Sequence, residues 1–344
     1  MRERTTLPAI ALAAALAAAC GEDVIVATRD SGAGNADSDT DTDTDTGAPG
    51  CTWQTAQLGL LSSVWGAGPS EIYAVGGATL TDILAFRFDG GSWQALPDPG
   101  TVVPMGLLDV WGFATGEIVC VGDFMMALHF AGTSWTTSNT QNASLRGVWG
   151  AARDDVWAVG GFLETVVTRW DGTVWSRVPA ADLPAVGPLA AVWGDGSGAV
   201  VAAGNGAILL FDGQSWSAMD VSAVVDSYLT VFRDVWGLSI ADLFVVGRHG
   251  LSLDGVALRF QGGQWLEQDL GPAAAGADLR GVHGAAPDDV WIVGERGGGG
   301  VVLRFDGGDW SEIGGPFGFP LNEVWAAGPQ RVFAVGEFGA VWCQ

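Results

Sequence analysis

Residues 148–160 read Val-Trp-Gly-Ala-Ala-Arg-Asp-Asp-Val-Trp-Ala-Val-Gly, and a version of this stretch occurs seven times in the 344-residue chain. Each copy begins with Val-Trp-Gly or a variant, continues with five residues, and ends in a short apolar run closed by Gly. The aromatic position is occupied in turn by Trp65, Trp111, Trp149, Trp193, Trp236, His283 and Trp325. Because short apolar runs bounded by Gly are typical of strands, each stretch predicts two strands joined by a tight turn.

The second half of each copy repeats as well. In six copies an aromatic residue, often followed by Asp-Gly, comes five residues before a second Trp. These pairs are Phe88/Trp93, Phe130/Trp135, Trp170/Trp175, Phe211/Trp216, Phe260/Trp265 and Phe305/Trp310. A period of about 42 residues with four short strands is typical of a propeller blade. We therefore predict that residues 51–344 form an all-β, seven-bladed β-propeller with four-stranded blades.

The two ends of the domain are predicted to complete the last blade together. The seventh copy stops at Gln344 before its second Trp, whereas Trp53 stands alone at the start of the domain. We expect residues 321–344 to supply the three inner strands and residues 51–58 the outer strand. A blade shared in this way closes the ring and removes two open sheet edges.

The cysteines agree with this closure. Cys51 and Cys343 lie on the two strands that are expected to pair, which predicts a disulfide bond between them in an exported protein. Two unpaired thiols are the alternative. Cys120 lies within an apolar run and is expected to be a buried thiol.

The N-terminal segment indicates export. Arg2 and Arg4 precede an Ala/Leu run too short to span a membrane, and the run ends Leu-Ala-Ala-Ala-Cys at Cys20. This ending resembles the lipobox of bacterial lipoproteins. The resemblance implies that residues 1–20 are a signal peptide, that Cys20 is lipidated, and that the lipid is the protein's contact with the outer membrane or cell surface. Ordinary cleavage that leaves Cys20 unmodified is the alternative.

Residues 21–50 are predicted to be a disordered tether. They hold eight acidic residues against one Arg, and Asp and Thr nearly alternate between Asp37 and Thr46. Such a segment cannot bury enough apolar surface to fold, and its charges repel one another. Calcium binding by the alternating carboxylates is the alternative.

Composition excludes several classes of function. The net charge is −24 and the chain has no Lys, so a nucleic-acid partner is not expected. With three His and two Tyr, material for acid–base or metal chemistry is scarce. No phosphate loop, nucleophile elbow or zinc motif occurs. We therefore expect no cofactor, no metal site and no assigned catalytic residue.

The Asp-Gly turns, together with the Trp that follows each, resemble the Asp-box of BNR repeats. These turns are Asp89-Gly90, Asp171-Gly172, Asp212-Gly213 and Asp306-Gly307. Across the whole domain the chain resembles bacterial lipoproteins with BNR-like propeller repeats, and the resemblance implies the fold more than an activity.

Loop lengths distinguish the two faces of the predicted ring. The turns between strands one and two, and between three and four, are constant in length, whereas the other connections vary. In an up-and-down blade the variable connections lie on one face, where loops can carry function on a rigid scaffold. Length drift without function is the alternative. From side-chain type and predicted face we select Tyr228, Arg248, His249, Asp254, Arg296 and Phe317 as candidate ligand-binding residues.

Three arginines form a further candidate site. Arg146, Arg233 and Arg280 occupy one position in the innermost strands of three copies. If that position faces the channel, the guanidinium groups can gather an anion. The trio resembles the carboxylate-binding Arg residues of sialidase-like propellers, which also need a Tyr nucleophile with an acidic partner. The alternative is charge balance with nearby acids, namely Asp109, Asp234 and Glu323.

Together these observations favour an exported, lipid-anchored propeller that is a non-enzymatic binding or assembly module. Its partner is expected to be a protein or a glycan that meets the variable loops. One alternative is a sialidase-like, glycan-active enzyme that uses the Arg trio. Another is a role in cofactor assembly, because the chain also resembles cofactor-assembly propellers of the photosystem-stability type.

Overall fold

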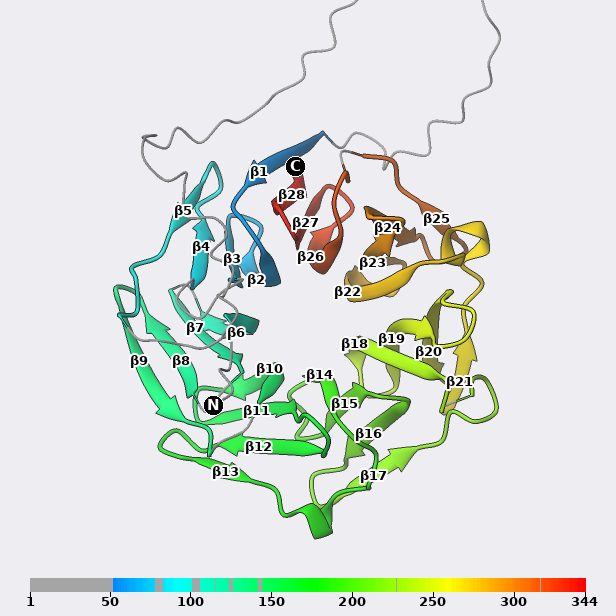
Figure 1. Cartoon of the computed structure of the whole chain (residues 1–344), viewed down its shortest axis with the longest axis horizontal. Helices are drawn as coiled ribbons and strands as arrows, with labels where there is room; N and C mark the ends of the chain where they lie inside the picture. The colour runs from blue at the N-terminus through cyan, green and yellow to red at the C-terminus, as the bar shows by residue number, and fades with distance from the viewer. Residues whose placement is uncertain are drawn as a thin grey trace, which may run out of the picture.

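The computed structural model describes residues 52–77, 83–100, 106–114, 116–123, 126–141, 144–226, 228–315 and 317–344. Seven four-stranded antiparallel sheets stand around a central opening, with the chain running once around the ring (Figure 1). The predicted seven-bladed β-propeller is confirmed. The predictions for the signal peptide, Cys20, the tether and Cys51 fall outside the described residues.

Every blade is a meander whose first strand lies nearest the channel. Blade 1 holds β2 (Leu61–Gly68), β3 (Glu71–Gly76), β4 (Leu84–Phe88) and β5 (Trp93–Ala95). Blade 2 holds β6 (Leu107–Ala114), β7 (Glu117–Gly122), β8 (Met126–Ala131) and β9 (Ser134–Asn139). Blade 3 holds β10 (Leu145–Ala152), β11 (Asp155–Gly160), β12 (Val166–Trp170) and β13 (Trp175–Arg177). Blade 4 holds β14 (Leu189–Gly194), β15 (Val200–Gly204), β16 (Ala207–Phe211) and β17 (Trp216–Met219).

The remaining blades follow the same plan. Blade 5 holds β18 (Thr230–Ser239), β19 (Asp242–His249), β20 (Gly255–Gln261) and β21 (Gln264–Glu267). Blade 6 holds β22 (Asp278–Ala286), β23 (Asp289–Arg296), β24 (Gly299–Phe305) and β25 (Trp310–Glu312). Blade 7 holds β26 (Leu321–Gly328), β27 (Arg331–Gly336), β28 (Gly339–Cys343) and β1 (Trp53–Gln57). Two short 3₁₀ helices, η1 (Ala180–Asp182) and η2 (Gly271–Ala274), lie between blades. No helix of the described residues is long and apolar enough to cross a membrane.

Packing between neighbouring blades explains the repeated Trp-Gly pair. At four junctions between blades, the indole of one blade lies over the Gly that follows the repeated aromatic residue of the next blade. A Cβ atom added at Gly66 would lie 2.6 Å from Trp325, and one added at Gly194 would lie 2.7 Å from Trp149. Such distances exclude any side chain, so the aromatic residue of one blade and the Gly of the next are required together.

In one junction both members of the repeated Trp-Gly pair are changed, and the two changes fit each other. Blade 6 carries His283 in place of Trp, and the next blade carries Ala326 in place of Gly. The smaller imidazole leaves room for the Ala methyl group, and the Ala326 N–H donates to His283 Nδ1 at 3.2 Å. The two departures from the repeat are therefore one compensated change.

The order of the strands gives the ring two different faces. The turns between strands one and two and between strands three and four lie on one side, which we call the fixed-turn face. The loops between strands two and three and the connections between blades lie on the other side, which we call the variable-loop face. In the described turns of the fixed-turn face, side-chain oxygens of Asp89, Asp171, Asp212 and Asp306 accept backbone N–H groups. The turns between strands three and four of blades 1, 3, 4 and 6 are thus held by Asp side chains.

Closure of the ring occurs in blade 7, as predicted. β1 pairs with β28 in antiparallel register from Trp53 opposite Cys343 to Gln57 opposite Gly339 (Figure 1). Because β28 ends and β1 begins at the fixed-turn face, the described parts of both termini lie on that face.

The Cys51–Cys343 disulfide stays a prediction, because Cys51 lies outside the described residues. Cys343 is buried, and its strand partner Trp53 follows Cys51 by two residues. Diagonal positions on paired strands are near neighbours. We expect peptide mapping of the exported protein without reductant to recover the two cysteines in one linked fragment. Recovery of Cys51 as a free thiol would show that strand pairing alone closes the ring.

Candidate functional site

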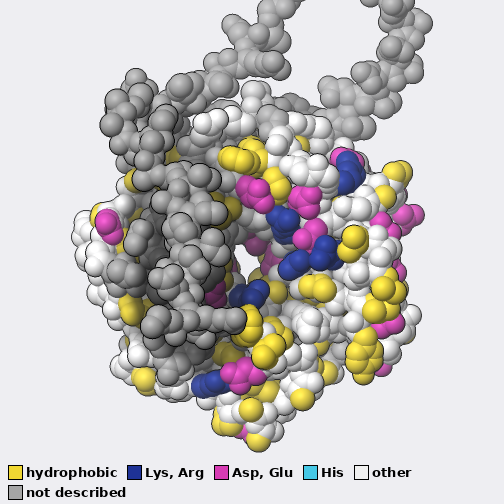
Figure 2. Space-filling view, viewed as in Figure 1, with side chains coloured by type: hydrophobic (Ala, Val, Ile, Leu, Met, Phe, Trp, Pro, Cys, Tyr) yellow, Lys and Arg dark blue, Asp and Glu magenta, His cyan; other side chains and the backbone are white. Residues whose placement is uncertain are grey.

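The predicted Arg trio lines one cavity at the mouth of the central channel. Arg146, Arg233 and Arg280 stand at the second residue, or its equivalent, of their innermost strands, so all three occupy the same level of the ring. They line a cavity of about 380 Å³ together with Ser62, Leu108, Ala190 and Asn322, which hold the same repeat position in the other four blades. Arg side chains gather at the rim of this opening (Figure 2).

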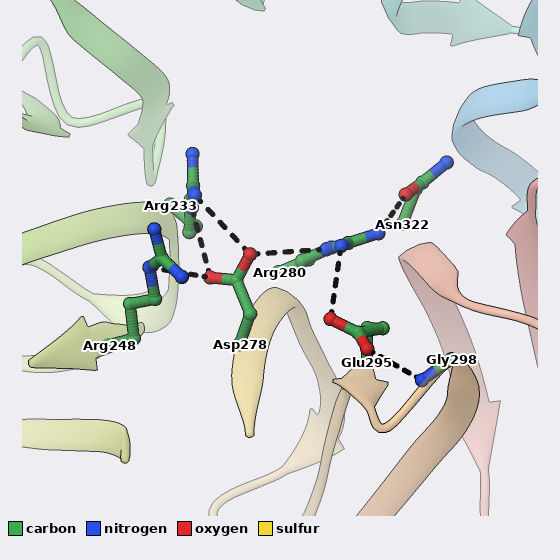
Figure 3. A network of polar contacts seen from close by, with 7 residues as sticks. All are labelled: Arg233, Arg248, Asp278, Arg280, Glu295, Gly298 and Asn322. Carbon is green, nitrogen blue, oxygen red and sulfur yellow. Dashed lines mark hydrogen bonds and ion pairs between the residues drawn. The ribbon is translucent and has the colours of Figure 1, made fainter. Parts of the chain in front are cut away.

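Asp278 organises most of this cluster. It is the first residue of β22. Its carboxylate forms ion pairs with Arg233 at 3.2 Å, Arg280 at 3.4 Å and Arg248 at 3.7 Å (Figure 3). Arg280 also donates to Asn322 at 3.0 Å and lies 3.6 Å from Glu295. Two members of the trio therefore already bind a carboxylate of the protein itself. The charge-balance interpretation is right for these two, but the partner acid is Asp278.

Arg146 differs from the other two arginines. Among the residues that the structure describes, it has no hydrogen-bond or ion-pair partner, and its side chain is exposed. A guanidinium that lines a cavity without a counter-ion is available to an anionic ligand.

Three acids lie one residue beyond the Arg level on innermost strands: Asp109 on β6, Asp234 on β18 and Glu323 on β26. Burial raises the pKa of Asp109 to about 6 and that of Asp234 to about 7. Burial and repulsion from Asp234 also raise the pKa of Glu323 well above its usual range. The Asp109 and Asp234 carboxyls accept the backbone N–H groups of Val148 and Val282 in the following blades at 2.7 and 2.8 Å. These acids therefore tie blades together.

The raised pKa values decide the charge of the channel mouth. At neutral pH the raised pKa values leave Glu323 protonated, Asp234 about half ionised and Asp109 mostly ionised, so these acids balance the guanidinium groups above them only in part. Asp278 and Glu295 then face four cations, Arg146 included, within a protein whose net charge is −24. The mouth of the channel can therefore bind a carboxylate or another small anion.

Exposed apolar side chains gather on the same face. Of the ten large apolar residues that stand exposed in the described part of the chain, seven lie in loops of the variable-loop face. These are Phe162, Leu163, Tyr228, Leu229, Leu251, Leu253 and Phe338. The loops that carry Leu229 and Gly250 are joined by a backbone hydrogen bond, and Leu253 holds a φ of 61°. A Leu in the left-handed region is strained, and exposed strained loops are often functional.

The structure places the other predicted residues around this face. Tyr228 is 97% exposed, and Arg248 joins the Asp278 cluster. His249 lies 3.5 Å from Glu267 beside a second cavity that Asp254 also lines. Arg296 is held by Glu312 at 2.6 Å and by the Ala273 carbonyl at 3.1 Å.

Phe317 was expected to be a ligand-binding loop residue, but the structure places it in the core. It is only 9% exposed and packs edge-on against Trp53, with ring centroids 4.9 Å apart. The apolar ring completes the core between blades 6 and 7, which the residue type alone did not distinguish from a surface aromatic.

The residues that the structure describes do not assemble a sialidase-like centre around the Arg trio. Tyr73 has an acidic partner, because its hydroxyl donates to Glu71. However, Tyr73 is fully buried, and burial beside that carboxylate raises its pKa to about 12. It pairs with Trp65 in the blade interior, three residues from the Arg level at Ser62. The Tyr73 hydroxyl and the Glu71 carboxylate both accept the N–H of Gly116 and so hold a turn of the next blade. Tyr73 and Glu71 are therefore separate from the channel mouth.

Sequence reasoning missed several residues of the site. Asn322 could have been found, because it holds the same repeat position as the Arg trio. Phe162 and Leu163 follow the Gly that ends β11, within a loop already identified as variable. Asp278 gave no signal, since its position at the start of the innermost strand is held by other residue types in the other blades.

Comparisons with known proteins support the fold alone. No family model and no curated protein matches the chain. A solved structure of YCF48 bound to D1 peptide is 17% identical with a TM-score of 0.62, covering 85% of this chain and 96% of that one. YCF48 from Cyanidioschyzon merolae is 16% identical with a TM-score of 0.60, covering 85% and 98%. Virginiamycin B lyase from Staphylococcus aureus is 10% identical with a TM-score of 0.66, covering 86% and 99%. The chain is thus similar in fold to β-propellers of different functions, one of which binds a peptide.

Proposed function

We propose that this protein is an exported, lipid-anchored and non-enzymatic module that binds a protein partner on its variable-loop face. One observation carries the proposal: most exposed apolar side chains of the described residues share that face with the positively charged channel mouth. Concentrated apolar surface beside Arg is typical of protein interaction sites. The aliphatic character of Leu163, Leu251 and Leu253 favours a protein over a glycan.

The position of the termini agrees with anchoring. The first described strand, β1, begins at the fixed-turn face, so a tether to a lipidated Cys20 would attach on that side. The variable-loop face would then point away from the membrane, toward partners. The peptide that YCF48 binds shows that a propeller of this architecture can hold a protein segment, which supports the proposal by analogy of fold.

Site-specific photo-crosslinking in the protein's own cells tests this proposal. A benzoylphenylalanine placed at Phe162 or Tyr228 is expected to give an adduct with the same partner, because both side chains stand exposed on the variable-loop face. The matched control is Val174, which is also exposed but lies in a turn of the fixed-turn face. Equal adducts from Val174, or none from the two loop positions, would contradict the proposal.

A further inference from the structure

Three adjacent cavities on the variable-loop face share lining residues, and we call them together the groove. The channel cavity shares Arg146, Ala190 and Arg233 with a cavity of about 420 Å³, which in turn shares Leu163 and Gly187 with a third of about 240 Å³. The groove runs along the variable-loop face of blades 3 and 4, from the connection at residues 180–187 inward to the channel. Cavities of this size are typical of sites for small ligands or short segments.

The inner end of the groove is cationic. Arg146 lines both the channel cavity and the middle cavity and has no partner among the described residues. Arg233 lines the same two cavities, but Asp278 already holds it. One guanidinium is therefore free to form a charge-assisted, two-pronged contact with a carboxylate.

The outer part of the groove is apolar. Phe162 and Leu163 form one wall and are 78% and 85% exposed, so both keep nearly all of their apolar surface in water. Pro188 and Val231 line the same cavity. Thr165 accepts the N–H of Gly187 at 3.2 Å and so ties the wall to the opposite connection. Covering Phe162 and Leu163 would remove an energetically unfavourable apolar surface from water.

We infer that this groove binds an extended peptide segment of the partner, with an acidic group on Arg146 and an apolar side chain against Phe162 and Leu163. The inference rests on the proposed function and specifies the chemistry of the partner. Charge complementarity selects an acidic segment, because the free charge at the inner end is positive. A single free Arg with Glu164 nearby in the groove does not suit a polyanion or an anionic lipid surface.

Selection from a random decapeptide library on the purified full chain tests the inference. Enriched peptides are expected to carry Asp, Glu or a free C-terminal carboxylate a few residues from Leu, Ile, Met or Phe. Fluorescence anisotropy of the best peptide should show about 10- to 100-fold weaker binding to Arg146→Gln, the loss expected for a charged hydrogen bond. Arg146→Lys keeps the charge and should recover part of the affinity. Leu163→Ser should weaken binding about 10-fold through lost apolar contact.

Two matched controls lie away from the groove. Arg153→Gln removes an Arg that is bonded to Glu117, and Val174→Ser removes an exposed apolar side chain of the fixed-turn face. Neither should change the affinity of the selected peptide.

Several outcomes would overturn the inference. These are a library without enriched peptides, enriched peptides that lack an acidic group, or binding unaffected by Arg146→Gln and Leu163→Ser. Binding to vesicles of phosphatidylglycerol and phosphatidylcholine that the same variants abolish would assign the groove to a lipid surface instead. Crosslinks from position 163 to residues 37–46 would assign it to the chain's own acidic segment. Adducts from Phe162 and Tyr228 with a protein partner would leave the proposed function standing even then.

Discussion

The stability of an Asp234→Asn variant, measured relative to the unchanged protein, is expected to rise by about 2 to 3 kcal/mol between pH 5 and pH 8. Burial raises the pKa of Asp234 from 3.8 to about 7 in the folded state. The folded protein therefore holds this proton in a range where the unfolded chain has lost it. The stabilising contribution is complete below pH 4 and disappears as the pH rises through 7, at about 1.4 kcal/mol for each unit. Asn has no such contribution to lose.

A difference between two proteins is needed because another buried group acts in the opposite direction. Burial lowers the pKa of His283 to about 4, so its contribution is present at pH 8 and falls as the pH drops below about 6.5. In the unchanged protein the two effects partly cancel, whereas His283 contributes equally to both members of the comparison.

Equilibrium urea unfolding at several pH values measures this difference. Asn offers one acceptor oxygen where Asp234 accepts the N–H groups of both Val235 and Val282, so a constant loss of about 1 kcal/mol should accompany the pH-dependent change. The control is Asp212→Asn in an exposed turn, where backbone hydrogen bonds lower the pKa of Asp212. Its effect should be constant from pH 5 to 8. A pH-independent Asp234→Asn difference would show that the carboxyl is ionised throughout the range.

Replacing His283 with Trp is expected to lower the free energy of unfolding by about 2 to 3 kcal/mol, although it restores the residue found in the other six copies. The Ala326 methyl group would meet the indole at the same distance that excludes a Cβ at Gly284, 2.7 Å from Trp236. Overpacking of this kind costs about 1 to 3 kcal/mol, and the hydrogen bond from Ala326 to His283 is lost as well.

Adding Ala326→Gly should recover most of that loss. Alone, Ala326→Gly should destabilise the protein by about 1 kcal/mol, so a positive coupling of at least about 1.5 kcal/mol is expected in the double-mutant cycle. Ala327→Gly is the control, because this neighbour is exposed on the same strand and should combine additively with His283→Trp. Unfolding at pH 8, where imidazole is neutral in both states, removes any proton linkage. Additivity of His283→Trp with Ala326→Gly would disprove the compensation.

The Asp234→Asn prediction also connects to ligand binding. As Asp109 and Asp234 ionise above their raised pKa values, negative charge collects beneath the Arg level of the channel. The anion affinity of the mouth should fall over the same pH range in which the relative stability of Asp234→Asn rises.

Residues that repeat could be predicted from the sequence, and residues that depart from the repeat could not. Trp65 and Gly112 belong to a pair that recurs in register, and this periodicity gave the blade count, whereas the lone Trp53 at the start of the domain gave the shared seventh blade. His283 and Ala326 are both visible as variants, yet their compensation depends on a contact between adjacent blades, 43 residues apart in the sequence. A pattern within one copy does not contain that contact.

The site divides in the same way. The shared position of Arg146, Arg233 and Arg280 predicted a common level of the ring, and the structure brings them to one cavity. Which of them is free depends on Asp278, whose position repeats but whose residue type does not. Phe317 was expected at the surface although it is buried, because it lies in a connection between blades whose length does not repeat.

The entry of the chain at β1 also determines how the molecule would respond to mechanical force. β1 runs from the fixed-turn face toward the variable-loop face, antiparallel to β28, with five residue pairs in register. Tension between a restrained N-terminal segment and a partner held on the opposite face would act along this strand. The pairs would then be sheared simultaneously and would share the load, whereas a sideways pull would peel them apart one after another. The ring is therefore built to resist traction in the direction in which an anchored protein would be pulled.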